Sequence, residues 1–295
     1  MNEFKNYHPI VNLMYFIVVI IFACIFLHPV ALAISLFVSF AYSTVLKGRH
    51  TLVRSVVHTV PMLIIMALIN PAFNHQGVTI ITYLPGGNPL TAESILYGFS
   101  AATMIVSVIM FFSCFNEVMT SDKFIYIFGR IIPSLSLVFS MVLRFVPKFI
   151  DDIKKVTDAQ RCIGRDVSSG SLIKRAVSGM SVLSVMITQS LENSVDTSDA
   201  MKSRGYGLPG RTAFSIYRFT KRDIKALITI LILSAYVITG KLQGVLKFEC
   251  FPYVDTAKLN IYALSVFAAY FILSALPVFI ELREVIKWKS IESKM

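Results

Sequence analysis

Over residues 145–166 the sequence reads FVPKFIDDIKKVTDAQRCIGRD, and over residues 196–212 it reads DTSDAMKSRGYGLPGRT. Each stretch predicts a helix that ends in a short element with alanine, arginine and glycine, Ala159–Gly164 (AQRCIG) and Ala200–Gly205 (AMKSRG). Glycine ends a helix by taking a positive φ without a Cβ clash, and arginine in the last turn suits the helix dipole. The two elements predict a pair of helices with an arginine at each tip, or else a basic helix end repeated by chance.

Composition indicates an integral membrane protein. Of the 295 residues 55% are hydrophobic and 15% are charged, and the mean hydropathy is +0.69, whereas soluble domains carry about 25% charged residues. The net charge of +11 fits the excess of basic residues on the cytoplasmic side of membrane proteins, so we expect no nucleic-acid partner. The cysteines show no CxxC spacing and no histidine companions, which predicts neither a metal site nor a disulfide framework: Cys24, Cys114, Cys162 and Cys250.

Six apolar runs approach the length of about 20 residues that a transmembrane helix needs. They are Ile10–Leu27, Val30–Leu46, Val56–Ile69, Ser94–Cys114, Ile224–Thr239 and Leu259–Ile280. The first run has no A-x-A-like cleavage site, so we expect a retained helix. A shorter run, Ile131–Val146, contains Pro133 and Arg144 and could be re-entrant, interfacial or a packed helix. The predicted fold class is an all-α integral membrane protein with about six transmembrane helices and long amphipathic cytoplasmic helices.

The chain is predicted to divide into residues 1–115 with the first four transmembrane helices, a cytoplasmic or interfacial region at 116–221, and residues 222–295 with the last two transmembrane helices and a tail. The middle region holds two amphipathic helices, Phe145–Arg161 and Leu172–Lys202, whose apolar residues recur at helical spacing. Such stripes suit helices that lie in a membrane interface or pack on one another.

Lysine and arginine set the expected orientation, with both termini in the cytoplasm. Segments 47–54 and 116–225 and the tail after residue 281 are then cytoplasmic, and they carry nearly all the basic residues. The outer segment 71–90 carries none, and the outer segment 241–258 carries only Lys241, Lys247 and Lys258.

The first outer loop, Asn70–Leu90, is rich in turn-forming residues. Within it Val78–Tyr83 predicts a short strand or a surface-lying segment. Thr91 and Glu93 predict the start of a helix with a threonine cap and an acidic first turn. We expect the apolar stretch Val78–Leu84 to pack on the chain's own helices or on a partner, the alternative being an unattached loop.

The sequence contains no HExxH, GxSxG or Walker A motif. Acidic residues are scarce within the expected spans, which argues against a proton relay in the bilayer. The informative feature is the basic amphipathic cytoplasmic region. Its arginines fit a protein partner that bears carboxylates, or an anionic lipid surface. Acidic residues in the same region weaken a purely lipid-binding role: Asp151, Asp152, Asp158, Glu192, Asp196 and Asp199.

Three stretches resemble the transmembrane T component of energy-coupling factor (ECF) transporters, a branch of the ABC transporters that takes up vitamins and metals. AMKSRGYG at 200–207, with Arg211-Thr212 and YRFTKRD after it, resembles the second Ala-Arg-Gly motif of that family. LRFVPKFIDDIKKVTDAQR at 143–161 resembles the helix before the first motif, and NPAFNHQGVT…LPGGNPLTAESILYG at 70–98 resembles the family's outer loop. The resemblance extends from about the third span to the sixth.

The resemblance implies long coupling helices whose motif arginines reach into grooves of two ABC ATPase subunits. Arg204 then stands at the second motif arginine. In the first motif Ile163 stands where the family commonly has arginine, and the flanking Arg161 and Arg165 could substitute for it. The implied ATPase contacts are Arg204, Ser203, Gly205, Arg161, Gly164 and Arg165.

The resemblance further implies a separate substrate-binding membrane (S) subunit and a bacterial or archaeal cell membrane. It implies no enzyme activity and no cofactor in this chain, because ATP would bind to the partner subunits. Three alternatives to this function exist. An intramembrane enzyme needs a polar catalytic set, and a secondary transporter predicts inverted repeats with interrupted helices; the sequence indicates neither. A membrane-anchoring or sensor subunit stays open.

Overall fold

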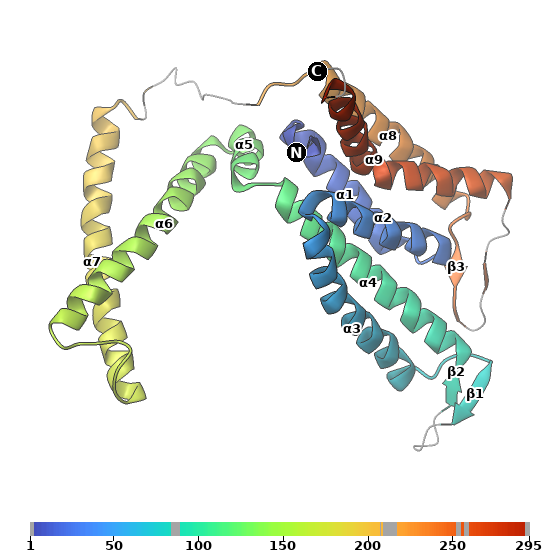
Figure 1. The fold of residues 1–295 in the computed structure, drawn as a ribbon, viewed down its shortest axis with the longest axis horizontal. Coiled ribbons are helices and arrows are strands. Elements are labelled where there is room, and N and C mark those ends of the chain that lie inside the picture. Colours follow the sequence, from blue (N-terminus) through green and yellow to red (C-terminus); the bar gives the residue numbers. More distant parts are fainter. Residues whose placement is uncertain are drawn as a thin grey trace. The chain divides into compact units, whose positions relative to one another are not determined.

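The structure, a computed structural model, describes residues 3–83, 89–206, 208, 217–251, 255–256 and 260–292. The chain forms two compact units (Figure 1): unit 1 comprises Met1–Phe124 and Tyr217–Met295, and unit 2 comprises Ile125–Ile216. The quoted residues Arg211 and Thr212 lie outside the described part of the chain. The three-part division by membrane location stays a prediction.

Unit 1 is built mainly of helices. Two of them, α1 and α2, begin with a histidine–proline pair: Nδ1 of His8 accepts from the backbone N–H of Ile10 at 3.3 Å, and Nδ1 of His28 accepts from that of Val30 at 3.3 Å. Proline suits the first helical position because its φ is preset and its missing N–H would have no helical partner. The elements are η1 (Phe4–Asn6), α1 (Pro9–Ile25), α2 (Pro29–Lys47), α3 (Arg49–Phe73), α4 (Ala92–Val118), α8 (Lys221–Leu242), α9 (Ile261–Glu292) and the start of α5 (Ser121–Ile131).

The core of unit 1 lies between these helices. Helix α4 packs against α1, α2 and α3, and α9 packs against α2 and α8. At one end of the core the buried ring of Phe4 makes edge-to-face contacts with Tyr15, Phe16 and Tyr42, with centroids 5.3, 6.5 and 6.4 Å away. Such aromatic contacts add stability beyond the area that they bury. They hold Phe4 inside the bundle.

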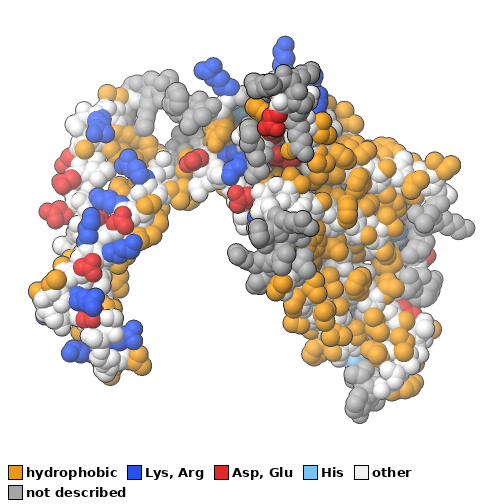
Figure 2. Space-filling view, viewed as in Figure 1, with side chains coloured by type: hydrophobic (Ala, Val, Ile, Leu, Met, Phe, Trp, Pro, Cys, Tyr) orange, Lys and Arg blue, Asp and Glu red, His pale blue; other side chains and the backbone are white. Residues whose placement is uncertain are grey.

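The all-α membrane fold class is confirmed. Among the described residues, four helices are long and apolar enough to cross a membrane: α2, α4, α8 and α9. The 17-residue α1 and the Thr59–Phe73 part of α3 are apolar but shorter. The total of six spans therefore stays a prediction. Figure 2 shows hydrophobic side chains over much of the visible face of unit 1, as expected for a surface solvated by lipid.

The described strands form two short antiparallel hairpins, β1 (Ile80–Tyr83) with β2 (Pro89–Thr91), and β3 (Phe248–Glu249) with β4 (Asp255–Thr256). The strand expected within Val78–Tyr83 is thus confirmed over Ile80–Tyr83.

Thr91 caps α4, as expected, by accepting from the backbone N–H of Ser94 at 3.4 Å. Oε1 of the buried Glu93 accepts from the N–H of Thr79 at 3.1 Å and so ties the loop to α4. The side chains of Val78, Ile81 and Tyr83 are exposed in the single chain. Packing of this loop on a partner stays a prediction, and its last residue, Leu84, lies outside the described residues.

Unit 2 contains the rest of α5 and the helices α6 (Pro133–Cys162) and α7 (Leu172–Ser203). The run Ile131–Val146 and the expected helix Phe145–Arg161 are not separate: they form one 30-residue helix that continues through Pro147. The helix is not ended by Pro147, although proline often ends or kinks a helix because it lacks an N–H and crowds the preceding turn. Because this helix begins at Pro133, the expected start at Phe145 is wrong. Helix α7 agrees with the expected Leu172–Lys202 to within one residue.

Candidate functional site

The end of α7 is a Schellman motif, in which a glycine with positive φ closes the last turn. Gly205 has φ 77° and donates its N–H to the carbonyl of Lys202 at 2.9 Å. The N–H of Tyr206 donates to the carbonyl of Met201 at 3.0 Å. Arg204 is the last residue before this glycine, and its side chain is exposed. The backbone thus holds a guanidinium at the tip of a 32-residue helix.

The end of α6 repeats the same backbone motif. Gly164 has φ 79° and donates to the carbonyl of Arg161 at 3.0 Å, and the N–H of Arg165 donates to the carbonyl of Gln160 at 2.9 Å. Ile163 has φ −95° and ψ 15°, close to the −84° and 9° of Arg204. Ile163 is therefore the structural equivalent of Arg204, and 67% of its surface is exposed. Both glycine-terminated helix ends expected from the sequence are confirmed.

Arg161 and Arg165 surround the apolar tip of α6 differently. Nε of Arg161 lies 3.8 Å from Oδ2 of Asp166, in the link after the helix. Hydrogen bonds from the N–H and hydroxyl of Ser168 keep the pKa of the Asp166 carboxyl below its usual value, and Arg161 acts in the same direction. Arg161 is thus directed back toward the link, whereas Arg165 is exposed beside Gly164.

Near Arg204 the neighbouring charges pair along the helix. Nζ of Lys202 lies 3.5 Å from Oδ1 of Asp199, one turn earlier, and the Ser203 hydroxyl donates to the carbonyl of Ala200 at 3.0 Å. Among the described residues Arg204 has no ion-pair partner within 4.0 Å. Its fork of donors is thus available to a carboxylate on another molecule.

A groove of about 550 Å³ runs between α6 and α7. Its α6 wall is aromatic and thioether-rich, and its α7 wall consists mostly of small polar side chains at helical spacing. The lining residues are Met141, Phe145, Lys148 and Phe149 from α6, with Ser190, Asn193, Ser194, Thr197, Ser198, Met201, Lys202 and Tyr206 from α7 and its end. Sequence reasoning missed this groove, although the period of the serine, threonine and asparagine residues was a signal for a shared face.

The groove shows how the two helices pair. The end of α7 at Met201 and Tyr206 faces α6 near Phe145. From Phe145 to Arg161 helix α6 continues for sixteen residues, about 24 Å at 1.5 Å per residue. The two Schellman motifs therefore lie well apart on the helix pair, as Figure 1 also shows within unit 2.

Helix α7 also carries a long apolar stripe that the described part of the chain leaves uncovered. Its members recur every three or four residues and are each more than half exposed: Ile173, Val177, Met180, Leu183, Ile187, Leu191 and Val195. Contiguous apolar surface of this kind marks a site that contacts a partner or lipid. Charged side chains lie elsewhere along α6 and α7 (Figure 2).

No group of three or more histidine, cysteine, aspartate or glutamate side chains that could hold a metal ion occurs in the described residues.

Comparison with known proteins shows the family to which the chain belongs. The profile of the CbiQ family, described as cobalt transport protein, matches residues 5–214. The chain belongs to this family. The match includes both Schellman motifs and ends before α8.

Curated relatives of the chain are energy-coupling factor transporter transmembrane proteins. The chain is 41% identical over 102 residues to the energy-coupling factor transporter transmembrane protein EcfT of Lactobacillus helveticus, covering 34% of this chain and 37% of the relative. It is 33% identical over 105 residues to EcfT of Lactococcus lactis subsp. cremoris, covering 35% of this chain and 40% of the relative. With EcfT of Bacillus selenitireducens it shares 26% identity over 196 residues, 63% of this chain and 73% of the relative. The first two matches span about two fifths of those relatives' length. The resemblance to the ECF T component is confirmed.

Proposed function

We propose that the chain is the energy-coupling membrane subunit of an ECF-type ABC importer. In this role it transmits motion of two ATPase subunits to a separate substrate-binding membrane subunit, for uptake of a micronutrient. The observation that carries the proposal is the pair of Schellman motifs at the ends of α6 and α7. Two similar tips on one helix pair suit two similar partner subunits.

The geometry of unit 2 supports a mechanical role. Helices α6 and α7 have 30 and 32 residues, so each is about 45–48 Å long. The two tips lie well apart on this pair, so one ATPase subunit can contact each of them. Helices that are paired along part of their length resist bending better than single ones. A displacement at a tip is then carried along the helix pair.

The chemistry of the tips supports an acidic partner surface. Arg204 presents five donors in a rigid fork that matches a carboxylate in two parallel hydrogen bonds. Ser203 and Gly205 set its position at the end of α7. At the end of α6, Arg161, Gly164 and Arg165 surround an apolar side chain, so this contact combines shape with weaker charge.

The apolar stripe on α7 supports contact with a membrane partner. A substrate-binding membrane subunit has an apolar surface because it lies in the lipid bilayer. The exposed Ile187, Leu191 and Val195 offer a complementary apolar face. With ATP bound and hydrolysed by the partner subunits, this chain needs no cofactor of its own. We propose that both termini and unit 2 lie in the cytoplasm of a bacterial or archaeal cell, which the concentration of basic residues in these segments supports.

Copurification tests the proposal. The tagged full chain is extracted from its native membranes in mild detergent, and the proteins that remain bound are identified by mass spectrometry. We expect two ATPase chains and a small membrane protein, and Mg-ATP hydrolysis by the purified assembly. The complex is then placed in lipid vesicles, where ATP added on the ATPase side should drive uptake. Recovery of a signalling kinase in place of ATPase chains would support the sensor alternative and end this proposal.

A further inference from the structure

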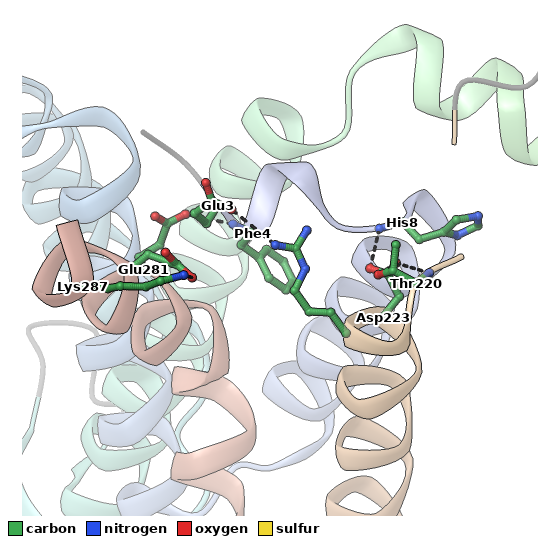
Figure 3. Close-up of polar contacts among 9 residues, drawn as sticks. Glu3, Phe4, His8, Thr220, Asp223, Glu281 and Lys287 are labelled. Atoms are coloured by element: carbon green, nitrogen blue, oxygen red, sulfur yellow. Dashed lines mark hydrogen bonds and ion pairs between the residues drawn. The ribbon is translucent and has the colours of Figure 1, made fainter. Parts of the chain in front are cut away.

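Residues 3–8 make polar contacts with several helices of unit 1 that are distant in sequence. Figure 3 shows Glu3, Phe4 and His8 beside residues of α8 and α9. We call the segment Glu3–His8 the N-terminal clip. Phe4 and His8 are at most 4% exposed, and the Phe4 ring sits in the aromatic core of unit 1. The clip is thus part of the bundle.

The clip contacts Lys123, next to the position where the chain passes from unit 1 to unit 2. Nζ of Lys123 donates to the carbonyl of Lys5 at 2.5 Å and to that of Val118 at 3.0 Å. The Asn12 amide, turned to satisfy both groups, accepts from Lys123 Nζ at 2.8 Å and donates to the carbonyl of Phe4 at 3.1 Å. Lys123 is 3% exposed. Its burial, and then the charge of Lys5, lower its pKa to about 8.

The clip also contacts the start of α8, near the position where the chain returns from unit 2 to unit 1. Oδ1 of Asp223, 2% exposed, accepts from the backbone N–H of His8 at 3.1 Å. Its Oδ2 accepts from the N–H and the hydroxyl of Thr220 at 2.9 and 2.6 Å. Thr220 is the N-cap residue of α8. Arg222 lies over the ring of Tyr7 at 4.4 Å and within 3.5 Å of the Glu3 carboxylate.

The clip has a third attachment inside the bundle. The backbone N–H of Phe4 donates to Oε1 of Glu281 on α9 at 3.1 Å, and Glu281 is 2% exposed. A buried carboxylate that accepts a backbone N–H fixes that N–H strongly, since a bond to a charged group is worth more than a neutral one. The clip is therefore anchored to α9 independently of its two outer contacts.

The positions of these contacts in the chain suggest a function for the clip. Unit 1 gives way to unit 2 after Phe124 and resumes at Tyr217. Lys123 directly precedes the first of these points, and Thr220 closely follows the second. The six residues of the clip thus contact both connections between unit 2 and the bundle, which we call the two roots of unit 2.

We propose that the N-terminal clip ties both roots of unit 2 to each other and to α9, and that ATP-driven movement of unit 2 reaches the bundle through this tie. The mechanical half of this inference rests on the proposed function, whereas the tie itself does not. Movement of unit 2 can displace the bundle only if the two connections between them stay rigid. Without the clip contacts, each root can move independently of the other. Movement at the tips of α6 and α7 then distorts the roots and does not displace the bundle.

Two substitutions break the tie on opposite sides. Lys123→Met removes the donor to Lys5 and Val118 and keeps an apolar chain of similar length in the buried site. Arg222→Leu removes the contacts with Glu3 and Tyr7 and leaves the Asp223 cap of α8 intact. The matched control is Glu93→Gln. Glu93 is 3% exposed, lies in the first turn of α4 and accepts a backbone N–H at 3.1 Å, like Asp223 on α8, but it holds the outer loop.

Hydrogen exchange of the full chain in lipid nanodiscs tests the tie without any partner. If the clip joins the roots, Lys123→Met raises exchange by about tenfold at 219–226 as well as at 118–126, and Arg222→Leu raises it at both places as well. Glu93→Gln raises exchange near Thr79 and at neither root. Faster exchange at only the mutated root, in both variants, would overturn the tie.

Transport tests the consequence. In vesicles that contain the chain with its copurified partners, both clip variants are expected to hydrolyse ATP at close to the parental rate while uptake per ATP falls several-fold. Uptake per ATP that equals the parent's in both clip variants would overturn the mechanical role. If the parent itself shows no ATP-driven uptake, the proposed function fails, and the exchange result alone decides whether the tie exists.

Discussion

The ends of α6 and α7 have nearly the same backbone and different chemistry. Both are Schellman motifs closed by a glycine, at φ 79° and φ 77°. The residue before the glycine is Ile163 in one and Arg204 in the other. The residue after it is Arg165 on α6 and Tyr206 on α7, and Tyr206 lines the groove together with Met201. The helix stop is thus duplicated while the charged contact is not, so the two tips should differ in binding more than in fold.

The largest effect is expected from removing the arginine of α7. Losing one partner of a charge-assisted contact at a buried interface costs about 2–5 kcal/mol. Arg204→Ala should therefore strongly weaken association with the ATPase subunits and abolish most uptake. Arg204→Lys should restore part of the binding, because lysine lacks the planar fork. The measurement is titration of the ATPase subunits onto the chain in detergent.

Lys202→Ala is the matched control for Arg204, since it removes a positive charge two residues earlier that is already paired with Asp199. It should bind the ATPase subunits almost as the parent does. Equal weakening by Lys202→Ala and Arg204→Ala would show that general positive charge matters and not the position of the fork. Unchanged binding by Arg204→Ala would remove α7 from the role of principal contact.

Making the two ends alike should produce the next largest effect. Ile163→Arg places a guanidinium at the position on α6 that corresponds to Arg204. If the partner groove there carries a free carboxylate, binding should tighten by about 1.5 kcal/mol, roughly tenfold. Ile163→Gln, which is long and uncharged, serves as the control. Weaker binding by both variants would mean that the apolar Ile163 side chain is itself the contact on α6.

The sequence predicted local features well because local chemistry determines them. Gly164 and Gly205 ended their helices as expected, and Thr91 capped α4, since a glycine at positive φ and a side-chain cap depend on a few neighbouring residues. The resemblance to the T component rested on the same short motifs. The contacts that these motifs make with ATPase subunits are not tested by the fold and stay predictions.

The features that the sequence did not predict depend on distant residues. The contact of Phe4 with Glu281 joins positions 277 apart, and that of His8 with Asp223 joins positions 215 apart, so no local pattern reports them. An amphipathic helix was expected to begin near Phe145 because the apolar run Ile131–Val146 before it was interpreted as a separate segment, whereas α6 begins at Pro133. The 11-residue α5 was missed because it is too short to stand out.

A smaller effect should come from the glycines that close the two ends. An alanine in the left-handed region costs about 1–2 kcal/mol, so Gly164→Ala and Gly205→Ala should each loosen the last turn. A Cβ on Gly205 would also lie 3.1 Å from Cδ1 of Leu208, whereas one on Gly164 would have no described neighbour within 4 Å. Hydrogen exchange of residues 160–165 and 201–206 measures the loosening.

Because the glycine on α7 positions Arg204, Gly205→Ala should lower ATPase affinity more than Gly164→Ala does. Gly170→Ala is a control, since Gly170 also has a positive φ, 95°, but lies in the link between α6 and α7. An equal loss of affinity in Gly164→Ala and Gly205→Ala would mean that the two ends contribute equally to binding.

The smallest effect is expected for Arg161→Ala. The side chain of Arg161 is 70% exposed, and its Nε lies 3.8 Å from Oδ2 of Asp166. Exposed ion pairs contribute about 0–1 kcal/mol. Three residues before Gly164, Arg161 corresponds to Lys202 on α7 and not to Arg204. Arg161→Ala should therefore change ATPase affinity by less than threefold, a free-energy change of about 0.6 kcal/mol or less. A loss as large as that of Arg204→Ala would instead show that Arg161 leaves Asp166 in the complex and takes the place that Ile163 cannot fill.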